Sequence, residues 1–138
     1  MKSMTYDMAE LYEQAEAARE NAYAPFSGFR VGAALLASDG RVFTGVNVEN
    51  SSYGATICAE RTAFVKAISE GARDFEAIAV TAGEEPAVPC GICRQFMSEF
   101  APHLTVITGP GEEYGGKLVA RSLDELLPEA FTLKENCR

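Results

Sequence analysis

The sequence predicts an α/β fold, a three-layer α/β/α sandwich around one mixed sheet of five strands. Strand-like apolar runs alternate with segments of helical periodicity, which is typical of helices packed on both faces of a sheet. The length of 138 residues and the hydrophobic content of 47% suit one globular domain over residues 1–138. No repeat or linker divides the chain, and residues 132–138 are expected to form a flexible tail.

The first part of the chain predicts one helix and a β-hairpin. Apolar residues recur at helical spacing over residues 5–23, so this segment is expected to be an amphipathic helix that ends before Pro25. Residues 31–36 form a continuous apolar run, and a turn signal at 38–40 separates it from a second run at 42–48. The continuous run predicts a strand that is buried on both faces.

The rest of the chain alternates between helices and strands. One helix is expected to stop at Gly71, because glycine readily ends helices. A short last helix is expected to start at Ser122, with Glu125 in the capping-box position. The expected elements are helix 58–70, strand 77–82, helix 90–100, strand 104–108, strand 117–120 and helix 122–127.

The charge balance argues against several partners. Acidic residues number 20 and basic residues 12, which gives a net charge of −8. Proteins that grip a phosphate backbone carry a basic stripe, and this sequence shows none, so nucleic acid polymers and anionic membranes are not expected partners. No apolar run approaches the roughly 20 residues that span a bilayer, and the first ten residues lack a secretory core. A cytoplasmic location is therefore expected.

The cysteines predict a metal site. In an intracellular chain, clustered cysteines indicate metal or redox chemistry rather than disulfides. Cys58 opens one expected helix, and Cys90 and Cys93 follow Pro89 at the start of another. Three sulfur ligands suit Zn²⁺ and leave one coordination position open, as in catalytic zinc sites. Cys137, near the chain end, is expected to be a free surface thiol.

Two residues beside Cys58 complete this candidate site. Glu60 lies two positions further on, so it can converge with Cys58 only if that cysteine sits at the very start of its helix. A helix start also favours a thiolate, and Glu60 is then the candidate acid/base group. Three thiolates give zinc excess negative charge, and Arg61 is a candidate for hydrogen-bonding a sulfur. Arg94 is a weaker candidate, and the alternative for Arg61 is an exposed helix arginine.

Two polar residues follow the second strand of the hairpin. Asn47 and Glu49 are two positions apart, so an extended chain points both side chains to the same side. An amide and a carboxylate in this arrangement could grip the hydroxyl groups of a sugar. The alternative is that they hydrogen-bond a turn.

Together, the two cysteine motifs match the known signature of zinc-dependent nucleobase deaminases. In four blocks in the right order, the chain resembles the small zinc-dependent cytidine deaminases that assemble as homotetramers. The blocks are residues 23–34 (YAPFSGFRVGAA), 45–50 (GVNVEN), 58–61 (CAER) and 89–95 (PCGICRQ).

The resemblance implies hydrolytic deamination of cytidine and deoxycytidine to uridine and deoxyuridine, with release of ammonia, as in pyrimidine salvage. Cys58, Cys90 and Cys93 would hold one zinc ion per subunit, which would activate water for attack on C4 of cytosine. Glu60 would carry protons from that water to ring nitrogen N3 and to the departing ammonia. The sequence does not indicate a preference between ribose and deoxyribose.

The resemblance also implies contacts with the substrate. Phe29 would pack against the pyrimidine ring, although a loop aromatic is more often buried in the core. Ala59 would hydrogen-bond the base through its backbone. Asn47 and Glu49 would hold the ribose 3′-hydroxyl.

Shared active sites are part of the same resemblance. The family's homotetramers close each pocket with an aromatic residue near the C-terminus of a neighbouring subunit, and Phe131 is similar to that residue. Tyr53 is similar to a residue that reaches an adjacent subunit's site.

Three other functions stay open. A deaminase of another aminated ring, such as the similar blasticidin-type deaminases, would use the same zinc chemistry, although residues 47–50 favour a nucleoside. A structural zinc module would need a fourth ligand, which could be His103 or Cys137. A thiol redox protein built on the Cys-X-X-Cys pair would leave the other motif cysteine and Glu60 without a role.

Overall fold

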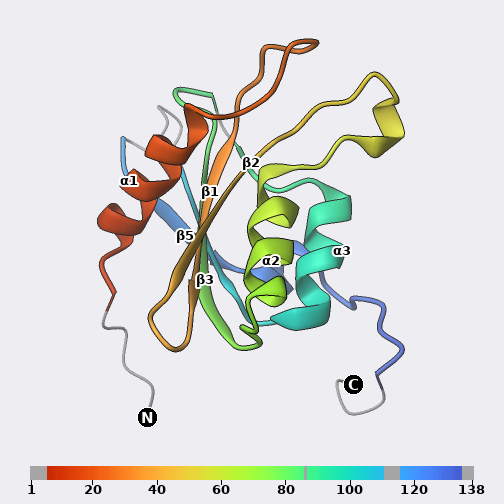
Figure 1. Ribbon diagram of the computed structural model, residues 1–138. Helices are drawn as coiled ribbons and strands as arrows, with labels where there is room; N and C mark the ends of the chain where they lie inside the picture. Colours follow the sequence, from red (N-terminus) through yellow and green to blue (C-terminus); the bar gives the residue numbers. More distant parts are fainter. Residues whose placement is uncertain (1–5, 86, 111–115, 135–138) are drawn as a thin grey trace.

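The molecule is a mixed five-stranded sheet with helices on both faces, as the sequence predicts. The computed structural model describes residues 6–85, 87–110 and 116–134. Its elements are α1 (Met8–Arg19), β1 (Gly32–Ala37), β2 (Val42–Val46), the 3₁₀ helix η1 (Tyr53–Ala55), α2 (Ala59–Ser69), β3 (Phe75–Thr81), α3 (Gly91–Phe100), β4 (Thr105–Thr108), β5 (Val119–Ser122) and α4 (Leu123–Leu126). The strand order is β2-β1-β3-β4-β5. Helix α1 covers one face of the sheet, and α2 and α3 lie side by side on the other (Figure 1).

The sheet topology explains where α3 begins. Strand β1 pairs antiparallel with β2 and β3, and β5 pairs antiparallel with β4, but β3 and β4 run parallel. A parallel pair needs a crossover connection, and α3 provides it. The start of α3 therefore follows directly on the loop that leaves the end of β3.

Strand β1 lies at the centre of two apolar layers. All six of its residues are buried, which confirms the prediction from the continuous apolar run. Alternate residues face opposite sides: Ala34 and Leu36 pack with α1, whereas Leu35 packs with α2 and α3.

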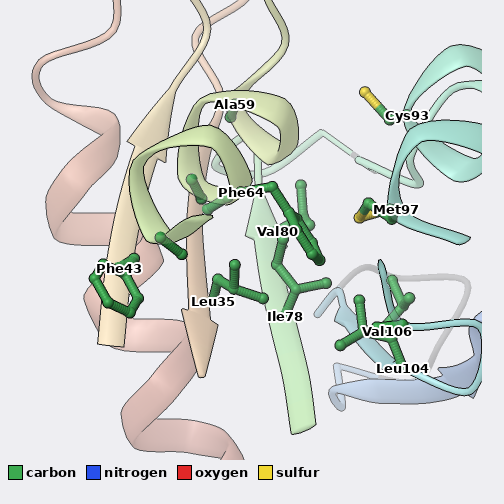
Figure 2. Close-up of a cluster of buried hydrophobic side chains, with 14 of the residues drawn as sticks. Leu35, Phe43, Ala59, Phe64, Ile78, Val80, Cys93, Met97, Leu104 and Val106 are labelled. Atoms are coloured by element: carbon green, nitrogen blue, oxygen red, sulfur yellow. The ribbon is translucent and has the colours of Figure 1, made fainter. Parts of the chain in front are cut away.

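An aromatic cluster joins the two helices of the second layer. Phe64 of α2 is fully buried over the sheet beside Val80 (Figure 2). Its ring centroid lies 6.4 Å from that of Phe96 and 6.0 Å from that of Phe100, both on α3. The ring of Phe75 on β3 lies 4.9 Å from the Phe64 ring. Aromatic pairs at these separations attract one another, so the cluster holds α2 against α3.

Helix α1 is shorter than the predicted helix over residues 5–23. It begins after Asp7, whose carboxylate caps the helix by accepting from the Ala9 N–H at 2.9 Å. It ends at Arg19 because the following segment pairs with another part of the chain. The Tyr23 N–H donates to the Asn47 carbonyl at 3.0 Å, and the Tyr23 carbonyl accepts from the Glu49 N–H at 2.9 Å.

The other boundaries lie within two residues of the sequence-based ranges. The last strand runs over Val119–Ser122 rather than residues 117–120. Gly71 follows the end of α2 with a φ of +96°, and the capping box of Ser122 and Glu125 is present at α4; both were predicted. Residues 135–138, with Cys137, lie outside the described residues, so the tail over 132–138 stays a prediction. Within the described part of the chain, no helix is long and apolar enough to cross a bilayer.

Two glycines let helices approach the sheet closely. A Cβ atom built on Gly32 would lie 2.1 Å from the Ala15 carbonyl oxygen of α1. A Cβ atom on Gly45 of β2 would lie 2.5 Å from the Ala59 carbonyl oxygen and 2.4 Å from the Ala63 nitrogen of α2. Backbone atoms cannot rotate away as a side chain can, so a side chain at Gly45 would push the first turn of α2 off the sheet.

We expect Gly45→Ala to lower the free energy of unfolding by about 1–3 kcal/mol, the usual penalty for overpacking a well-packed contact. Gly54→Ala is the matched control, because a Cβ atom there meets no atom within 4 Å. Urea unfolding of both variants provides the measurement. Equal midpoints for the two variants would contradict the close approach of α2 to β2.

Candidate active site

Two helix starts supply the sulfur atoms of the site. Cys58 is the N-cap residue of α2 and Cys90 is the N-cap residue of α3, both with extended backbone conformations. Neither side chain makes a capping hydrogen bond to its own helix. Each sulfur is therefore available at a helix N-terminus, where the helix dipole favours negative charge. Cys93 lies in the first turn of α3 and is buried.

The three sulfur atoms are close enough to share one metal ion. Those of Cys58, Cys90 and Cys93 all lie within 4.8 Å of one another, and the Cys58 and Cys90 sulfurs are 4.0 Å apart. Zn–S bonds of about 2.3 Å at tetrahedral angles place sulfur atoms about 3.8 Å apart. The residues present therefore fit a zinc ion held by three thiolates.

The thiols of Cys58 and Cys93 are affected in opposite directions by their surroundings. The pKa of Cys58 is lowered to about 5, chiefly by a hydrogen bond from the Cys93 thiol and also by the neighbouring Arg61 guanidinium. The same hydrogen bond raises the pKa of Cys93, as does its burial. The surroundings of Cys58 thus favour its thiolate form. A metal ligand must be deprotonated, so Cys93 would give up its proton on binding a metal.

Arg61 brings positive charge to the sulfurs. Its Nη2 atom lies 3.6 Å from the Cys58 sulfur and 3.4 Å from the Thr56 carbonyl oxygen. Its Nε atom is buried, with no hydrogen-bond partner among the described residues. The guanidinium therefore faces the sulfur cluster rather than open solvent. There it partly offsets the negative charge of the thiolates.

Glu60 is a buried carboxyl group beside the sulfurs. Its side chain is 4% exposed, and it lies in the first turn of α2. Burial raises the pKa of Glu60 to about 7, and the negative charge of Cys58 acts in the same direction. A group with this pKa can both accept and donate a proton near neutral pH, as acid/base catalysis requires.

A cavity of about 170 Å³ brings Cys58, Cys90 and Glu60 together with several of the predicted substrate contacts. It is lined by Phe29, Val31, Asn47, Cys58, Ala59, Glu60, Val80, Ala87, Val88 and Cys90. A larger hollow of about 380 Å³ lies between the start of α1 and the β1–β2 hairpin. That hollow contains none of the three clustered cysteines, so the smaller cavity is the candidate active site.

Asn47 and Glu49 both hydrogen-bond the loop before β1. The Asn47 amide accepts from the Val31 N–H at 2.9 Å and donates to the Phe29 carbonyl at 2.8 Å. The Glu49 carboxylate accepts from the N–H groups of Phe26 and Ser27 at 2.9 and 3.1 Å. Asn47 lines the cavity, whereas Glu49 does not. Both side chains thus hydrogen-bond the backbone of a loop, as the alternative to sugar binding predicts.

The remaining predicted contacts lie in different places. Ala59 is fully buried in the cavity wall, and Phe29 lines the cavity while its side chain stays 43% exposed. Tyr53 and Phe131 are 81% and 67% exposed and do not line their own chain's cavity. The Phe131 carbonyl accepts a hydrogen bond of 3.0 Å from the Gln95 side chain of α3.

Sequence reasoning missed four residues of the cavity wall, and they share small or branched apolar side chains: Val31, Val80, Ala87 and Val88. Nothing in a single sequence distinguishes these from ordinary core residues. Val80 could have been suspected, because residues near the end of a strand that precedes a crossover often border sites in α/β sheets.

Comparisons with known proteins agree with this site. The family model described as "Cytidine and deoxycytidylate deaminase zinc-binding region" matches residues 5–108. A cytidine deaminase from Sporosarcina psychrophila is 47% identical over 94% of both chains. One from Halalkalibacterium halodurans is 50% identical over 94% of this chain and 97% of its own. A blasticidin-S deaminase from Bacillus cereus is 33% identical over 74% of this chain and 76% of its own.

A solved structure shares the fold over almost the whole chain. The crystal structure of cytidine deaminase from Burkholderia pseudomallei superposes with a TM-score of 0.84 at 50% identity, covering 91% of this chain and all of its own. Sequence, fold and sulfur cluster therefore lead to one conclusion: the chain belongs to the zinc-binding cytidine and deoxycytidylate deaminase family.

Proposed function

We propose that this protein catalyses the hydrolytic deamination of cytidine and deoxycytidine to uridine and deoxyuridine, with release of ammonia. The observation that carries this proposal is the convergence of three cysteine sulfurs within 4.8 Å of one another, at a cavity that Cys58 and Cys90 line together with the buried Glu60. Relatives named cytidine deaminase at 47% and 50% identity support the choice of substrate. The reaction would serve pyrimidine salvage.

Cys58, Cys90 and Cys93 would hold one zinc ion per subunit. Bound there, zinc supplies an activated water molecule at an open coordination position. The chain's own contribution is to keep the sulfurs as thiolates. The two helix starts and the Arg61 guanidinium, 3.6 Å from the Cys58 sulfur, all favour that charge.

Glu60 would move the protons of the reaction. It accepts a proton from the water that attacks C4 of the cytosine ring and delivers it to ring nitrogen N3. It then carries the second proton of that water to the amino group, so that the C4–N bond breaks and ammonia leaves while a carbonyl forms at C4. Burial favours the protonated form of this carboxyl group and a neighbouring cation favours its ionised form, which suits a group that must alternate between base and acid.

The cavity wall would hold the base and the sugar. Phe29 would pack on the pyrimidine ring, and the backbone of Ala59 would hydrogen-bond the base. Asn47 would contact the ribose 3′-hydroxyl with the amide hydrogen that Phe29 does not use, together with Glu49. The apolar residues Val31 and Val80 would exclude water from the reacting ring.

A homotetramer with shared active sites is part of the proposal. Tyr53 and Phe131 are aromatic residues that are 81% and 67% exposed in one chain, and aromatic residues are enriched in protein interfaces. In the assembly, Phe131 would close the pocket of a neighbouring subunit. We also propose a cytoplasmic location, where a reducing environment keeps the three clustered cysteines as thiols.

Two of the alternatives are weaker on specific observations. The blasticidin-S deaminase match covers 74% of this chain at 33% identity, less on both measures than the two cytidine deaminases. A structural zinc site needs a fourth ligand, and His103 is instead exposed, with its Nδ1 atom 2.9 Å from an Asp124 carboxylate oxygen. Among the described residues, the metal-binding group consists of three cysteines.

The metal site predicts which cysteines hold zinc. Purified protein should contain one zinc ion per chain. Cys90→Ala should lower zinc affinity by more than about tenfold, because mutating a residue that only hydrogen-bonds a metal ligand already costs about 10–100-fold in metal affinity. Cys90 is exposed, so its truncation spares the core. Cys137→Ala is the control and should retain the metal. The measurement is the zinc content of each variant after dialysis. Zinc loss in Cys137→Ala would indicate a closed site with four ligands.

The acid/base role predicts a sharp loss in Glu60→Gln. Wild-type protein should release ammonia from cytidine and deoxycytidine but not from adenosine or blasticidin S. The variant should keep its zinc and lose about 10²- to 10⁴-fold in kcat, the usual contribution of general acid–base catalysis. Glu13→Gln, an exposed change on α1, is the matched control. Substantial activity in Glu60→Gln would refute the proton-transfer role.

The shared-site proposal predicts an effect of Phe131→Ala on substrate binding. Removing a ring that packs on the substrate should raise KM for cytidine by about tenfold or more, with zinc content unchanged. Leu133→Ala is the control, since Leu133 is 82% exposed and has no proposed role.

Subunit mixing then tests whether Phe131 acts in a neighbouring pocket. When Phe131→Ala and Glu60→Gln subunits are dissociated and reassembled together, hybrid tetramers pair an intact Glu60 with an intact Phe131. We expect a fraction of sites with wild-type KM. Activity equal to the sum of the two parent tetramers would contradict shared sites.

A further inference from the structure

The hydroxyl group of Ser27 links two residues of the proposed substrate site. It donates a hydrogen bond to the Oε2 atom of Glu49 and accepts one of 2.9 Å from the Phe29 N–H. Ser27 itself is exposed and does not line the cavity. It is therefore hydrogen-bonded to both of these residues without lining the cavity itself.

A count of acceptor sites on Glu49 shows what Ser27 leaves available. An ionised carboxylate offers about four lone-pair sites, two on each oxygen. The Phe26 and Ser27 N–H groups use both sites of Oε1, and the Ser27 hydroxyl uses one site of Oε2. Among the described residues, these donors leave a single acceptor site, on Oε2. One substrate hydroxyl can occupy that site.

The neighbouring amide supplies the complementary donor. Asn47 Nδ2 uses one N–H on the Phe29 carbonyl, which leaves a second N–H for another acceptor. A hydroxyl group can accept from an amide N–H and donate to a carboxylate at the same time. One donor on Asn47 and one acceptor on Glu49 are therefore the pair that a single sugar hydroxyl needs.

We propose that Ser27 is a positioning residue for nucleoside recognition, which orients the Glu49 carboxylate so that its remaining acceptor site meets the ribose 3′-hydroxyl. This inference rests on the proposed function, in which Glu49 holds that hydroxyl. Ser27 makes no contact with the substrate itself. Its second hydrogen bond, from the Phe29 N–H, keeps the base-packing residue in register with the sugar-binding one.

The charge state of Glu49 supports this role. The hydrogen bond from the Ser27 hydroxyl is the main cause that holds the pKa of Glu49 below its usual range, and the two backbone N–H groups add to it. The same hydrogen bond that orients the carboxylate therefore also favours its ionised, acceptor form.

The test compares cytidine with 3′-deoxycytidine, which lacks the hydroxyl in question. In Ser27→Ala, kcat/KM for cytidine should fall about tenfold, chiefly through KM, since one hydrogen bond to a charged group is worth a factor of this order. The value for 3′-deoxycytidine should change much less. Ser27→Thr keeps the hydroxyl group and should restore the preference for cytidine.

Two further variants separate positioning from loss of stability. Glu49→Gln should reduce the preference for cytidine at least as strongly as Ser27→Ala does. Ser122→Ala removes a serine hydroxyl from the cap of α4, away from the cavity, and should lower stability without changing the ratio of the two substrates.

The possible failures are distinguishable. If wild-type protein turns over neither nucleoside, the proposed function is contradicted. If it prefers cytidine and Glu49→Gln removes that preference while Ser27→Ala leaves it intact, the inference about Ser27 alone is overturned. An equal loss with both substrates in Ser27→Ala would also overturn it, because Ser27 would then only support the loop.

Discussion

The convergence of two helix N-termini is the constraint on which the rest of the structure depends. The sulfur atoms of Cys58 and Cys90 lie 4.0 Å apart although their residues are 32 positions apart in the chain. The crossover between parallel strands β3 and β4 fixes where α3 begins, and the Phe64 ring cluster holds α2 against it. Gly45 permits the first turn of α2 to lie directly on β2. The fold and the geometry of the site therefore depend on the same helix contacts, because a shift of either helix would separate the sulfurs.

The same arrangement places charged groups where an apolar core would be more stable. Burial raises the pKa of Glu60 from 4.5 to about 7, so burial of this group costs the fold stability as pH rises through this range, on the order of 3 kcal/mol once the group is ionised. A divalent cation beside Glu60 favours its ionised form and offsets this loss. Metal binding, thiolate formation and the charge of Glu60 thus support one another, with Arg61 contributing further positive charge.

Local signals in the sequence predicted the helices, the hairpin, the capping box and the three clustered sulfurs, since these depend on periodicity, caps and motif spacing. They did not predict the strand order, nor that α1 ends at Arg19, because Tyr23 pairs with a segment more than 20 residues away. Asn47 and Glu49 show most clearly what the sequence alone cannot predict. Spacing placed them together, but only the folded loop shows that their side chains hold residues 26–31 and what hydrogen-bonding capacity remains.

The central claim is a zinc ion held by three cysteine sulfurs with one position left for water. X-ray absorption spectroscopy at the zinc edge of the purified protein tests it directly, because sulfur and lighter ligands scatter differently. The account predicts three sulfur neighbours at about 2.3 Å and one oxygen neighbour. A fit that requires four sulfur neighbours, or fewer than three, would contradict it.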